Sequence, residues 1–170
     1  MAAHLIGEPA AGRSDHDLSF LPNGPRESEA GVTVLRVTSP HSIDQVLRRY
    51  ADAWTAGDIT AVLDAYHPDF TLHYFGTSPL AGTHEGKDAA LKVLSEATAR
   101  SNRTLVEVVD VLGGADLGAL VVVERLGPDD DPREVRRVFV YRTQHDKLLE
   151  CWLYDEDQSF VDRLWSTPPP

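Results

Sequence analysis

The sequence predicts an α+β fold in which helices come first and an antiparallel sheet follows. Before Arg100, apolar residues recur at the three- to four-residue spacing of amphipathic helices. After Arg100, the chain changes to four runs rich in Val, Leu and aromatic residues, separated by short turns. Consecutive strands with such short connections pair as an antiparallel meander. Helices followed by a meander are typical of α+β domains, in which the helices cover one face of a curved sheet.

The pattern of residues 42–57 predicts the first helix. Ser42 and Gln45 have the spacing of a capping box at a helix start. Gly57 is expected to end the helix, because glycine readily adopts the left-handed conformation found at helix ends. The apolar stripe of this helix consists of Ile43, Val46, Leu47, Tyr50 and Trp54.

A second helix and a strand over residues 70–75 are predicted next. Asp58 is expected to cap this helix and Pro68 to end it, since proline lacks the backbone N–H that a helix interior needs. The apolar stripe of the second helix consists of Ile59, Val62, Leu63 and Tyr66. Because tyrosine hydroxyls lie on or near both stripes, the two helices could form the wall of a ligand pocket instead of a plain core.

The later segments complete the predicted fold. Residues 76–82 predict a loop, and Gly86 leads into a third helix with a buried face of Ala90, Leu91, Leu94 and Ala97. The four predicted strands span residues 105–112, 119–126, 133–143 and 148–154. A short closing helix is predicted over residues 157–165, and the final prolines end all regular structure.

The chain is expected to contain one folded domain over residues 38–166. Residues 1–37 are predicted to form a flexible arm, because most of this segment is rich in Gly, Pro, Ser and acidic residues and shows no periodicity. Residues 32–37 have strand propensity and could add one edge strand. Residues 167–170 form a proline-rich tail.

The composition restricts the classes of partner. The chain has 170 residues and a formal net charge of -11. A surface this acidic repels nucleic-acid phosphates and anionic membranes, so neither is an expected partner. The single cysteine, Cys151, excludes an intrachain disulfide and a multi-cysteine metal site. No signal-peptide pattern or long apolar stretch is visible, so a cytoplasmic location is expected.

Several motifs resemble the SnoaL-like branch of the nuclear transport factor 2-like superfamily, which also contains ketosteroid isomerase, scytalone dehydratase and limonene epoxide hydrolase. The resemblance rests on residues 50–58, 67–69, 79–88 and 146–152, which carry mainly turns, caps and core positions. It implies a cone-shaped barrel in which a curved, mainly antiparallel sheet wraps around about three N-terminal helices. It also implies a deep apolar pocket and a dimer.

The resemblance implies roles for individual residues. Tyr50 matches the first-helix tyrosine that donates to a developing oxyanion in the isomerases. Tyr74 stands where those enzymes have a general base, and Val138 stands where they have a second donor, so steroid-type isomerisation is not implied. In SnoaL-type polyketide cyclases the acid/base is an aspartate directly after the last-strand tryptophan. Here a leucine follows Trp152, and Asp155 lies two residues further along the same face of the strand.

Two carboxylates are the candidate general acid/base groups. Asp155 would face an apolar interior, where burial raises a carboxyl pKa toward neutrality. Alternatively, it belongs to the polar turn before the last helix, for which Asp157 is the expected cap. Glu124 interrupts an apolar row on one face of its strand. It would serve the pocket, pair with Arg136 or Arg137 on the next strand, or be solvated if the other face is buried.

Aromatic and histidine side chains supply the remaining candidates. Tyr50 and Tyr74 could donate to a substrate oxygen, or both could be core aromatics with satisfied hydroxyls. The candidate substrate-binding residues are Trp54, His73, His84 and Trp152, although both tryptophans also suit plain packing. His73 and Tyr74 are adjacent in a strand, so only one of them can face the pocket, whereas His84 is expected near the mouth of the cone. The scattered histidines predict no metal site.

These features predict a small enzyme that needs no cofactor and acts on an apolar polyketide- or terpenoid-like metabolite. Its reaction would be a cyclisation, isomerisation, dehydration or epoxide opening by acid/base chemistry. The alternative is a non-catalytic module of the same fold that binds a small molecule or a protein. Two inward carboxylates within bonding reach of a common point would favour the enzyme, whereas a purely apolar or self-filled cone would favour the binding module. A homodimer across the outer face of the meander is expected, because residues 105–153 contain more apolar side chains than three helices would cover.

Overall fold

The computed structural model describes residues 41–167 of the chain. The arm and edge strand predicted within residues 1–37 lie outside the described residues, as do the last three prolines. The helices are α1 (Ile43–Thr55), α2 (Ile59–Asp64), α3 (Lys87–Ser101) and α4 (Gln158–Ser166). The strands are β1 (Tyr66–Tyr74), β2 (Gly82–Glu85), β3 (Thr104–Gly113), β4 (Gly118–Leu126), β5 (Arg133–Gln144) and β6 (Lys147–Asp155).

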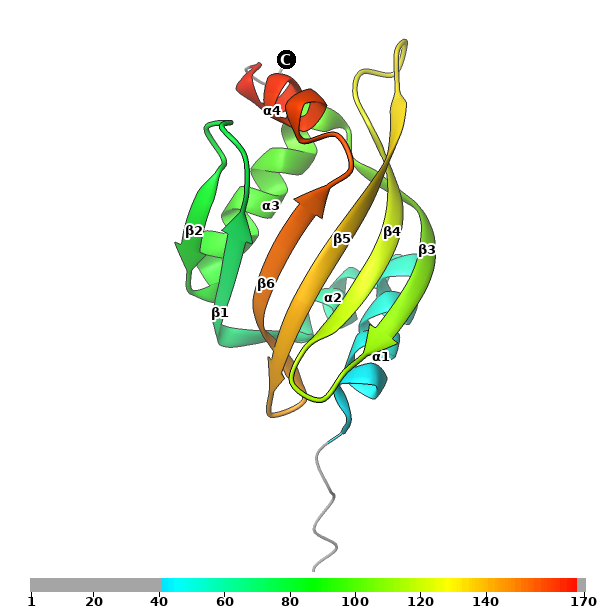
Figure 1. Ribbon diagram of the computed structural model, residues 1–170, viewed down its shortest axis with the longest axis vertical. Coiled ribbons are helices and arrows are strands. Elements are labelled where there is room, and N and C mark those ends of the chain that lie inside the picture. The colour runs from blue at the N-terminus through cyan, green and yellow to red at the C-terminus, as the bar shows by residue number, and fades with distance from the viewer. Residues whose placement is uncertain (1–40, 168–170) are drawn as a thin grey trace, which may run out of the picture. The chain divides into compact units, whose positions relative to one another are not determined.

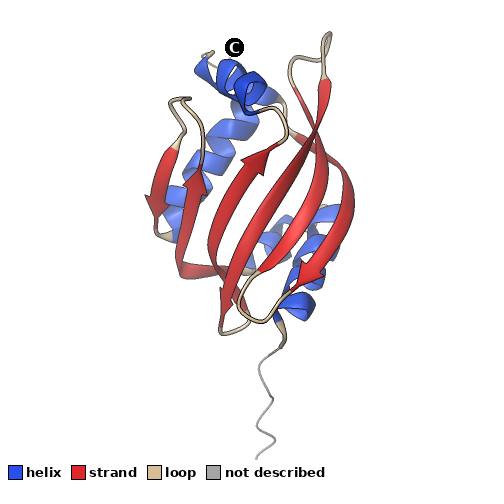
Figure 2. Cartoon of the chain, viewed as in Figure 1, coloured by secondary structure: helices blue, strands red, loops and turns tan. Residues whose placement is uncertain are grey.

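The strands form one six-stranded sheet in the order β2-β1-β6-β5-β4-β3. Neighbouring strands are antiparallel except β1 and β6, which are parallel. The sheet is curved, and α1, α2 and α3 all lie on one of its faces (Figures 1 and 2). This arrangement confirms the predicted α+β class, in which helices cover one face of a curved and mainly antiparallel sheet.

Alternation along the central strand β4 shows which face of the sheet is buried. In β4, Leu120 and Val122 are fully buried, whereas Val121 between them is only half-buried. Successive side chains of a strand point to opposite faces, so this pattern fixes which face packs on the helices. The inner face meets Leu47 of α1 and Ala90 of α3, both of which are completely buried. The core therefore lies between the sheet and helices α1 and α3, and Val161 and Trp165 of α4 also belong to it.

The start of α1 follows the prediction. The Ser42 hydroxyl accepts a hydrogen bond from the backbone N–H of Gln45 at 3.3 Å, and the Gln45 side chain accepts from the backbone N–H of Ser42 at 3.0 Å. This reciprocal pair satisfies two N–H groups that have no partner within the helix. After the helix, Gly57 has a φ of 70°. Glycine tolerates this left-handed conformation without strain, so the chain can turn sharply into α2.

The second helix is shorter than predicted, and Pro68 does not end it. The helix ends at Asp64, and Pro68 lies inside β1. The chain becomes extended at Tyr66 because Tyr66 is the register partner of Leu148 in β6, whose N–H donates to Ala65 at 2.8 Å. Proline fits this strand because the pairing with β6 is irregular between Tyr66 and Thr71, so its missing N–H costs no ladder bond.

The short strand β2 was not predicted. The sequence up to Gly82 is rich in loop-forming residues, but the chain returns as a four-residue strand that pairs with the end of β1. The four later strands confirm the predicted runs to within a residue or two at each end. The closing helix α4 is also confirmed, and Asp157 caps it by accepting from the N–H of Phe160 at 2.9 Å. Within residues 41–167, no helix is both long and apolar enough to cross a membrane.

Candidate ligand-binding cavity

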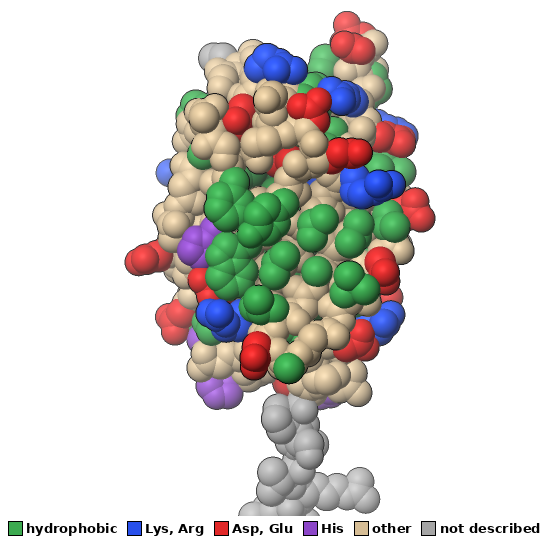
Figure 3. Space-filling view, in the orientation of Figure 1, with side chains coloured by type: hydrophobic (Ala, Val, Ile, Leu, Met, Phe, Trp, Pro, Cys, Tyr) green, Lys and Arg blue, Asp and Glu red, His purple; other side chains and the backbone are tan. Residues whose placement is uncertain are grey.

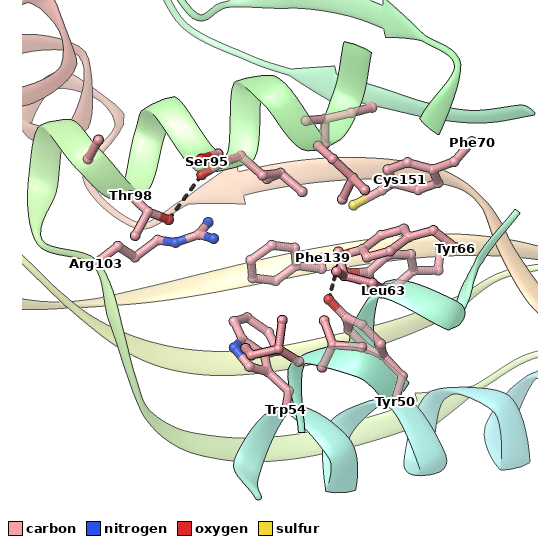
Figure 4. A pocket seen from close by; sticks show the side chains of 17 residues that line it. Tyr50, Trp54, Leu63, Tyr66, Phe70, Ser95, Thr98, Arg103, Phe139 and Cys151 are labelled. Carbon is pink, nitrogen blue, oxygen red and sulfur yellow. Dashed lines mark hydrogen bonds between the residues drawn. The ribbon is translucent and has the colours of Figure 1, made fainter. Parts of the chain in front are cut away.

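A cavity of about 540 Å³ lies between the inner face of the sheet and the helices α1, α2 and α3. Its size falls in the range of pockets that hold small organic molecules. Most of its wall is apolar, with contributions from Trp54, Leu63, Phe70, Leu91, Leu94 and Phe139 (Figure 4). The exposed side chain of Ile59, a residue of the predicted α2 stripe, also belongs to the lining. The α2 stripe therefore faces the cavity instead of a closed core.

Three tyrosines form a hydroxyl-bearing part of the wall. Tyr50 on α1, Tyr66 at the start of β1 and Tyr141 on β5 all line the cavity and are at most 5% exposed. The hydroxyls of Tyr50 and Tyr66 are 2.7 Å apart and share one hydrogen bond (Figure 4). The Tyr141 ring packs edge-on against Tyr50, with 5.9 Å between the ring centroids. A hydroxyl pair that shares one bond retains a second hydrogen, which can be donated to a ligand oxygen.

Burial determines the protonation state of this wall. Removal from water raises the pKa of Tyr50 to about 12, although the hydrogen bond with Tyr66 opposes the shift. Burial likewise raises the pKa of Tyr66 and of the Cys151 thiol, which also lines the cavity. These groups are therefore neutral near pH 7. The tyrosines act there as hydrogen-bond donors, and Cys151 is an unreactive thiol.

Arg103 brings a positive charge to the cavity. Asn102 ends α3 in the left-handed conformation, with a φ of 46°, and turns the chain so that Arg103 enters the wall just before β3. The guanidinium points into the cavity (Figure 4). Its Nε lies 3.5 Å from Oε1 of Glu124, and the side chain is 14% exposed. Within the described part of the chain, the buried Nη1 atom of Arg103 has no hydrogen-bond partner.

A second polar group lies on the inner face of the sheet and is centred on the completely buried Arg137. The guanidinium donates to Glu124 at 2.6 Å, to Asp155 at 2.5 Å and to the hydroxyl of Tyr74 at 2.6 Å. Trp165 of α4 covers it, with 5.3 Å between the guanidinium carbon and the ring centroid. We call Arg137, Glu124, Asp155 and Tyr74 the Arg137 cluster. None of its four residues belongs to the lining of the cavity.

Opposing effects set the pKa values in the Arg137 cluster. Burial raises the pKa of Asp155 above its ordinary value, although the adjacent Arg137 works against this shift. Burial would lower the pKa of Arg137, but the surrounding Tyr74, Glu124 and Asp155 raise it well above its ordinary value. Arg137 is therefore a permanent cation, and the two carboxylates are its counter-ions.

The two candidate carboxylates thus lie within bonding reach of a common point, and the guanidinium of Arg137 occupies that point. Of the three alternatives for Glu124, the structure shows the ion pair with the neighbouring strand. The partner on that strand is Arg137 and not Arg136. Asp155 is not the helix cap, because Asp157 fills that position.

The other candidates lie in different places. Tyr50 and Trp54 line the cavity, whereas Tyr74 contacts Arg137. His73 and Trp152 stack on each other with 5.2 Å between ring centroids, and His73 bonds to Glu150 at 2.8 Å. Their strand neighbours Tyr74, Cys151 and Leu153 point inward, so His73 and Trp152 lie on the outer face and do not line the cavity. His84 bonds to the carbonyl of Leu80 at 3.0 Å, also away from the lining.

Sequence reasoning did not single out Arg103, Tyr66 or Tyr141 as site residues. Tyr141 could have been found from the two-residue period of its strand, since it follows the inward Phe139 by two positions. Tyr66 was assigned to a helix stripe, and Arg103 directly follows a helix end, where an arginine is usually solvated. The sequence around Tyr66 and Arg103 therefore contains no local pattern that indicates a pocket. Among residues 41–167, no group of three or more His, Cys, Asp or Glu side chains could hold a metal ion.

Comparison with known proteins identifies the family. The model of the SnoaL-like domain matches residues 47–151, which is more than half of the chain. The chain belongs to the SnoaL-like family. The matched region begins within α1 and ends within β6, so it includes the tyrosines of the cavity, Arg103 and Arg137, whereas Asp155 lies beyond it. A search of curated proteins found no match.

Solved structures with the same fold agree with this SnoaL-like assignment. A protein with a cystatin-like fold from Xanthomonas campestris is 22% identical, with a TM-score of 0.65 over 72% of this chain and 97% of that one. An NTF2-like protein from Burkholderia xenovorans is 18% identical, with a TM-score of 0.59 over 76% and 100%. A putative SnoaL-like polyketide cyclase from Jannaschia is 16% identical, with a TM-score of 0.58 over 77% and 97%. At these identities the likeness establishes the fold, which is the predicted nuclear transport factor 2-like fold.

Proposed function

We propose that this SnoaL-like protein binds a mainly apolar, oxygen-bearing metabolite in the cavity and, without a cofactor, promotes a reaction in which Tyr50 donates a hydrogen bond to a substrate oxygen that gains negative charge, while water takes up the proton that the substrate releases. The observation that carries the proposal is the Tyr50–Tyr66 hydroxyl pair, which is set in the wall of a large apolar cavity. A polyketide- or terpenoid-like molecule has the matching chemistry, namely an apolar body with few oxygens. The Jannaschia neighbour, described as a putative SnoaL-like polyketide cyclase, supports this substrate class.

The hydroxyl pair suits a reaction in which a substrate oxygen gains negative charge. Cyclisation through an enolate, isomerisation, dehydration and epoxide opening all share such a step. A donor held at the position of the developing charge stabilises the transition state more than the ground state. Because burial keeps Tyr50 protonated, its hydroxyl is a donor to this oxygen at any ordinary pH.

Glu124 and Asp155 have a different place in this proposal. Both are bonded to Arg137, so either could accept a substrate proton only after releasing that cation. Leaving a buried arginine without a counter-ion is costly. We therefore assign ligand contact to Tyr50 and Tyr66, with Trp54 as an apolar wall, and assign Glu124, Asp155 and Tyr74 to holding Arg137.

A non-catalytic binding module is the second candidate. It is favoured by one observation: within the described residues, no carboxylate lines the cavity. Both candidates require a ligand in the same place and differ only in turnover. Comparing the bound compound before and after incubation, by mass and by chromatography, separates them. An unchanged ligand across a panel of polyketide-like and terpenoid-like compounds would favour the binding module.

The variant Tyr50→Phe tests the proposed function. Loss of one oxyanion donor should lower turnover by about 100-fold or more, whereas affinity should fall only by about two- to tenfold. Binding can be followed by the fluorescence of Trp54, which lines the cavity. Tyr154→Phe is the matched control, since Tyr154 is 47% exposed on the outer face of the sheet. Equal turnover in both variants would contradict the assignment of Tyr50.

We also propose that the protein is a homodimer formed by the outer face of the sheet. This face carries an apolar patch, visible in Figure 3, that includes Phe75, Val106, Val109, Leu112 and Tyr154, each at least 41% exposed. A patch of this kind on an otherwise charged protein is typical of an interface. Arg142 and Glu150, of opposite charge, also lie on this face, so a two-fold copy need not bring like charges together.

Sedimentation tests the proposed dimer. The wild type should sediment as a dimer and Val109→Lys as a monomer, and a monomeric wild type would contradict the proposal.

A further inference from the structure

We infer that α2 is a lid over the cavity, that ligands enter and leave between α2 and α3, and that the side chain of Lys87 fastens the lid. This inference rests on the ligand binding proposed above and adds the route by which a ligand passes. The structure describes the closed form, in which α2 and α3 are the two sides of the mouth.

The exposed residues of the lining locate the mouth of the cavity. A side chain that borders both the cavity and the solvent marks the opening between them. Five lining residues are exposed, and every other one is buried or half-buried. The exposed ones are Ile59 and Leu63 of α2 and Ser95, Thr98 and Ala99 of α3. The cavity therefore opens to solvent between these two helices.

The two sides of this mouth are held unequally. Helix α3 has 15 residues and buries Ala90, Ala97 and Ser101, whereas α2 has six residues and no buried side chain. An element with few buried contacts opens locally at a small cost in free energy. Gly57, just before α2, has a φ of 70°, and a Cβ added there would meet no atom within 4 Å, so this turn has room to change. For these reasons α2 is the side that moves.

Two lysine side chains hold the C-terminal end of α2. The last carbonyls of a helix have no partner within it and carry partial negative charge. The Nζ of Lys87 donates to the carbonyl of Leu63 at 2.7 Å, and the Nζ of Lys147 donates to the carbonyl of Asp64 at 2.5 Å. Lys147 belongs to β6 and ties α2 to the sheet, whereas Lys87 is the first residue of α3 and ties α2 across the mouth.

The position of Lys87 suits a reversible fastening. A cation in the first turn of a helix is disfavoured by the positive end of the helix dipole. The bond of Lys87 to the negative end of α2 offsets this unfavourable position. Because Lys87 is only half-buried, its ammonium can leave the carbonyl for water without becoming a buried, unpaired charge.

A lid has a kinetic consequence that a fixed wall lacks. The ligand passes through the same open form in both directions. A larger open population therefore raises the association and dissociation rate constants by the same factor and leaves their ratio, the dissociation constant, unchanged. Loss of a contact in a fixed wall would instead raise mainly the dissociation rate constant.

The first test is amide hydrogen exchange of the full-length protein. The hydrogen-bonded amides of Val62 and Ala65 should exchange at least about tenfold faster than the interior amides of α3. Lys87→Met should speed the exchange of these two amides by a further factor of about three to ten, the usual effect of losing one hydrogen bond, and should leave α1 unchanged. Lys92→Met, at an exposed lysine of the same helix, is the matched control and should change neither.

The second test is stopped-flow binding of N-phenyl-1-naphthylamine, an uncharged apolar probe that becomes fluorescent when it leaves water. In Lys87→Met, the association and dissociation rate constants should both rise by about three- to tenfold, while the dissociation constant stays within about twofold of wild type. In Lys92→Met, both rate constants should equal those of wild type.

The outcomes separate the lid from the proposed function. Exchange that is as slow in α2 as in α3 would overturn the lid, and this measurement on wild type decides even if Lys87→Met folds poorly. Equal rate constants in Lys87→Met and Lys92→Met, or a rise in the dissociation rate constant alone, would also overturn it and leave ligand binding intact. If the probe did not bind to wild type, the proposed binding function and the lid would both fail.

Discussion

The Arg137 cluster and the wall of the cavity both place polar groups on the inner face of the same sheet, but they use their hydrogen bonds differently. In the cluster, all the named partners of Arg137 are side chains of the protein itself. In the cavity, the Tyr50–Tyr66 pair lines the wall and retains one hydroxyl hydrogen that their shared bond does not use. Glu124 joins the two regions, because it bonds to Arg137 and lies 3.5 Å from Arg103.

This difference separates structural polar groups from ligand-binding ones. A buried cation that bonds to carboxylates and a hydroxyl of the protein itself stabilises one arrangement of the fold and has no donor left for a ligand. A donor that is left over beside a cavity costs free energy in the empty protein and recovers it when a ligand supplies an acceptor. Removal of cluster residues should therefore affect stability, and removal of cavity residues should affect binding.

The largest expected effect is that of Arg137→Met on stability. Loss of the cation leaves Asp155 buried without a counter-ion and Glu124 with only Arg103, at 3.5 Å, which should lower the free energy of unfolding by about 3–5 kcal/mol. Urea unfolding measures this change. Arg136→Met is the matched control on the same strand, because Arg136 is exposed and should change stability by only about 0.5 kcal/mol. Similar stability of the two variants would show that the cluster does not hold the fold together.

Asp155→Asn should have a smaller effect on stability. The amide keeps the shape of the side chain but loses the charge that faces Arg137, so a loss of about 1–3 kcal/mol is expected. Ligand affinity should stay within about twofold of wild type, because Asp155 does not line the cavity.

The same variant tests the original expectation for Asp155. If turnover fell by about two to four orders of magnitude while thermal stability stayed unchanged, Asp155 would be a general acid/base and its assignment to the Arg137 cluster would be wrong. Glu124→Gln is the companion variant, since the two carboxylates cannot both be essential in the same role.

Local patterns predicted most of the fold but not the positions that depend on distant contacts. The capping box of Ser42 and the two-residue period of the later strands are local, and both were predicted correctly. Tyr66 fits a helical stripe as well as a strand, and only its pairing with Leu148, far along the chain, decides the matter. For this reason α2 was predicted too long and the start of β1 was missed.

The candidate site shows the same limit. The alternation of β4 indicated that Glu124 could face inward, but it could not choose between Arg136 and Arg137 as its partner. That choice depends on the register of β4 against β5, in which Val122 is opposite Arg137. The position of Arg103 depends on where α3 ends and on the cavity beside it. Neither the register nor the cavity can be read from a single segment.

The smallest expected effect concerns the pH dependence of ligand binding. The cavity needs the Tyr50 hydroxyl in its protonated form, and burial raises the pKa of Tyr50 to about 12. Binding that depends on this hydroxyl should be lost only as the pH rises through about 12. Affinity for an uncharged, oxygen-bearing ligand should therefore stay constant between about pH 6 and pH 10. Calorimetry across this range measures it, with Tyr50→Phe as the control that lacks the titrating group. A loss of affinity in wild type with a midpoint below pH 10, absent from Tyr50→Phe, would show that the hydroxyl is more exposed to water than the structure indicates.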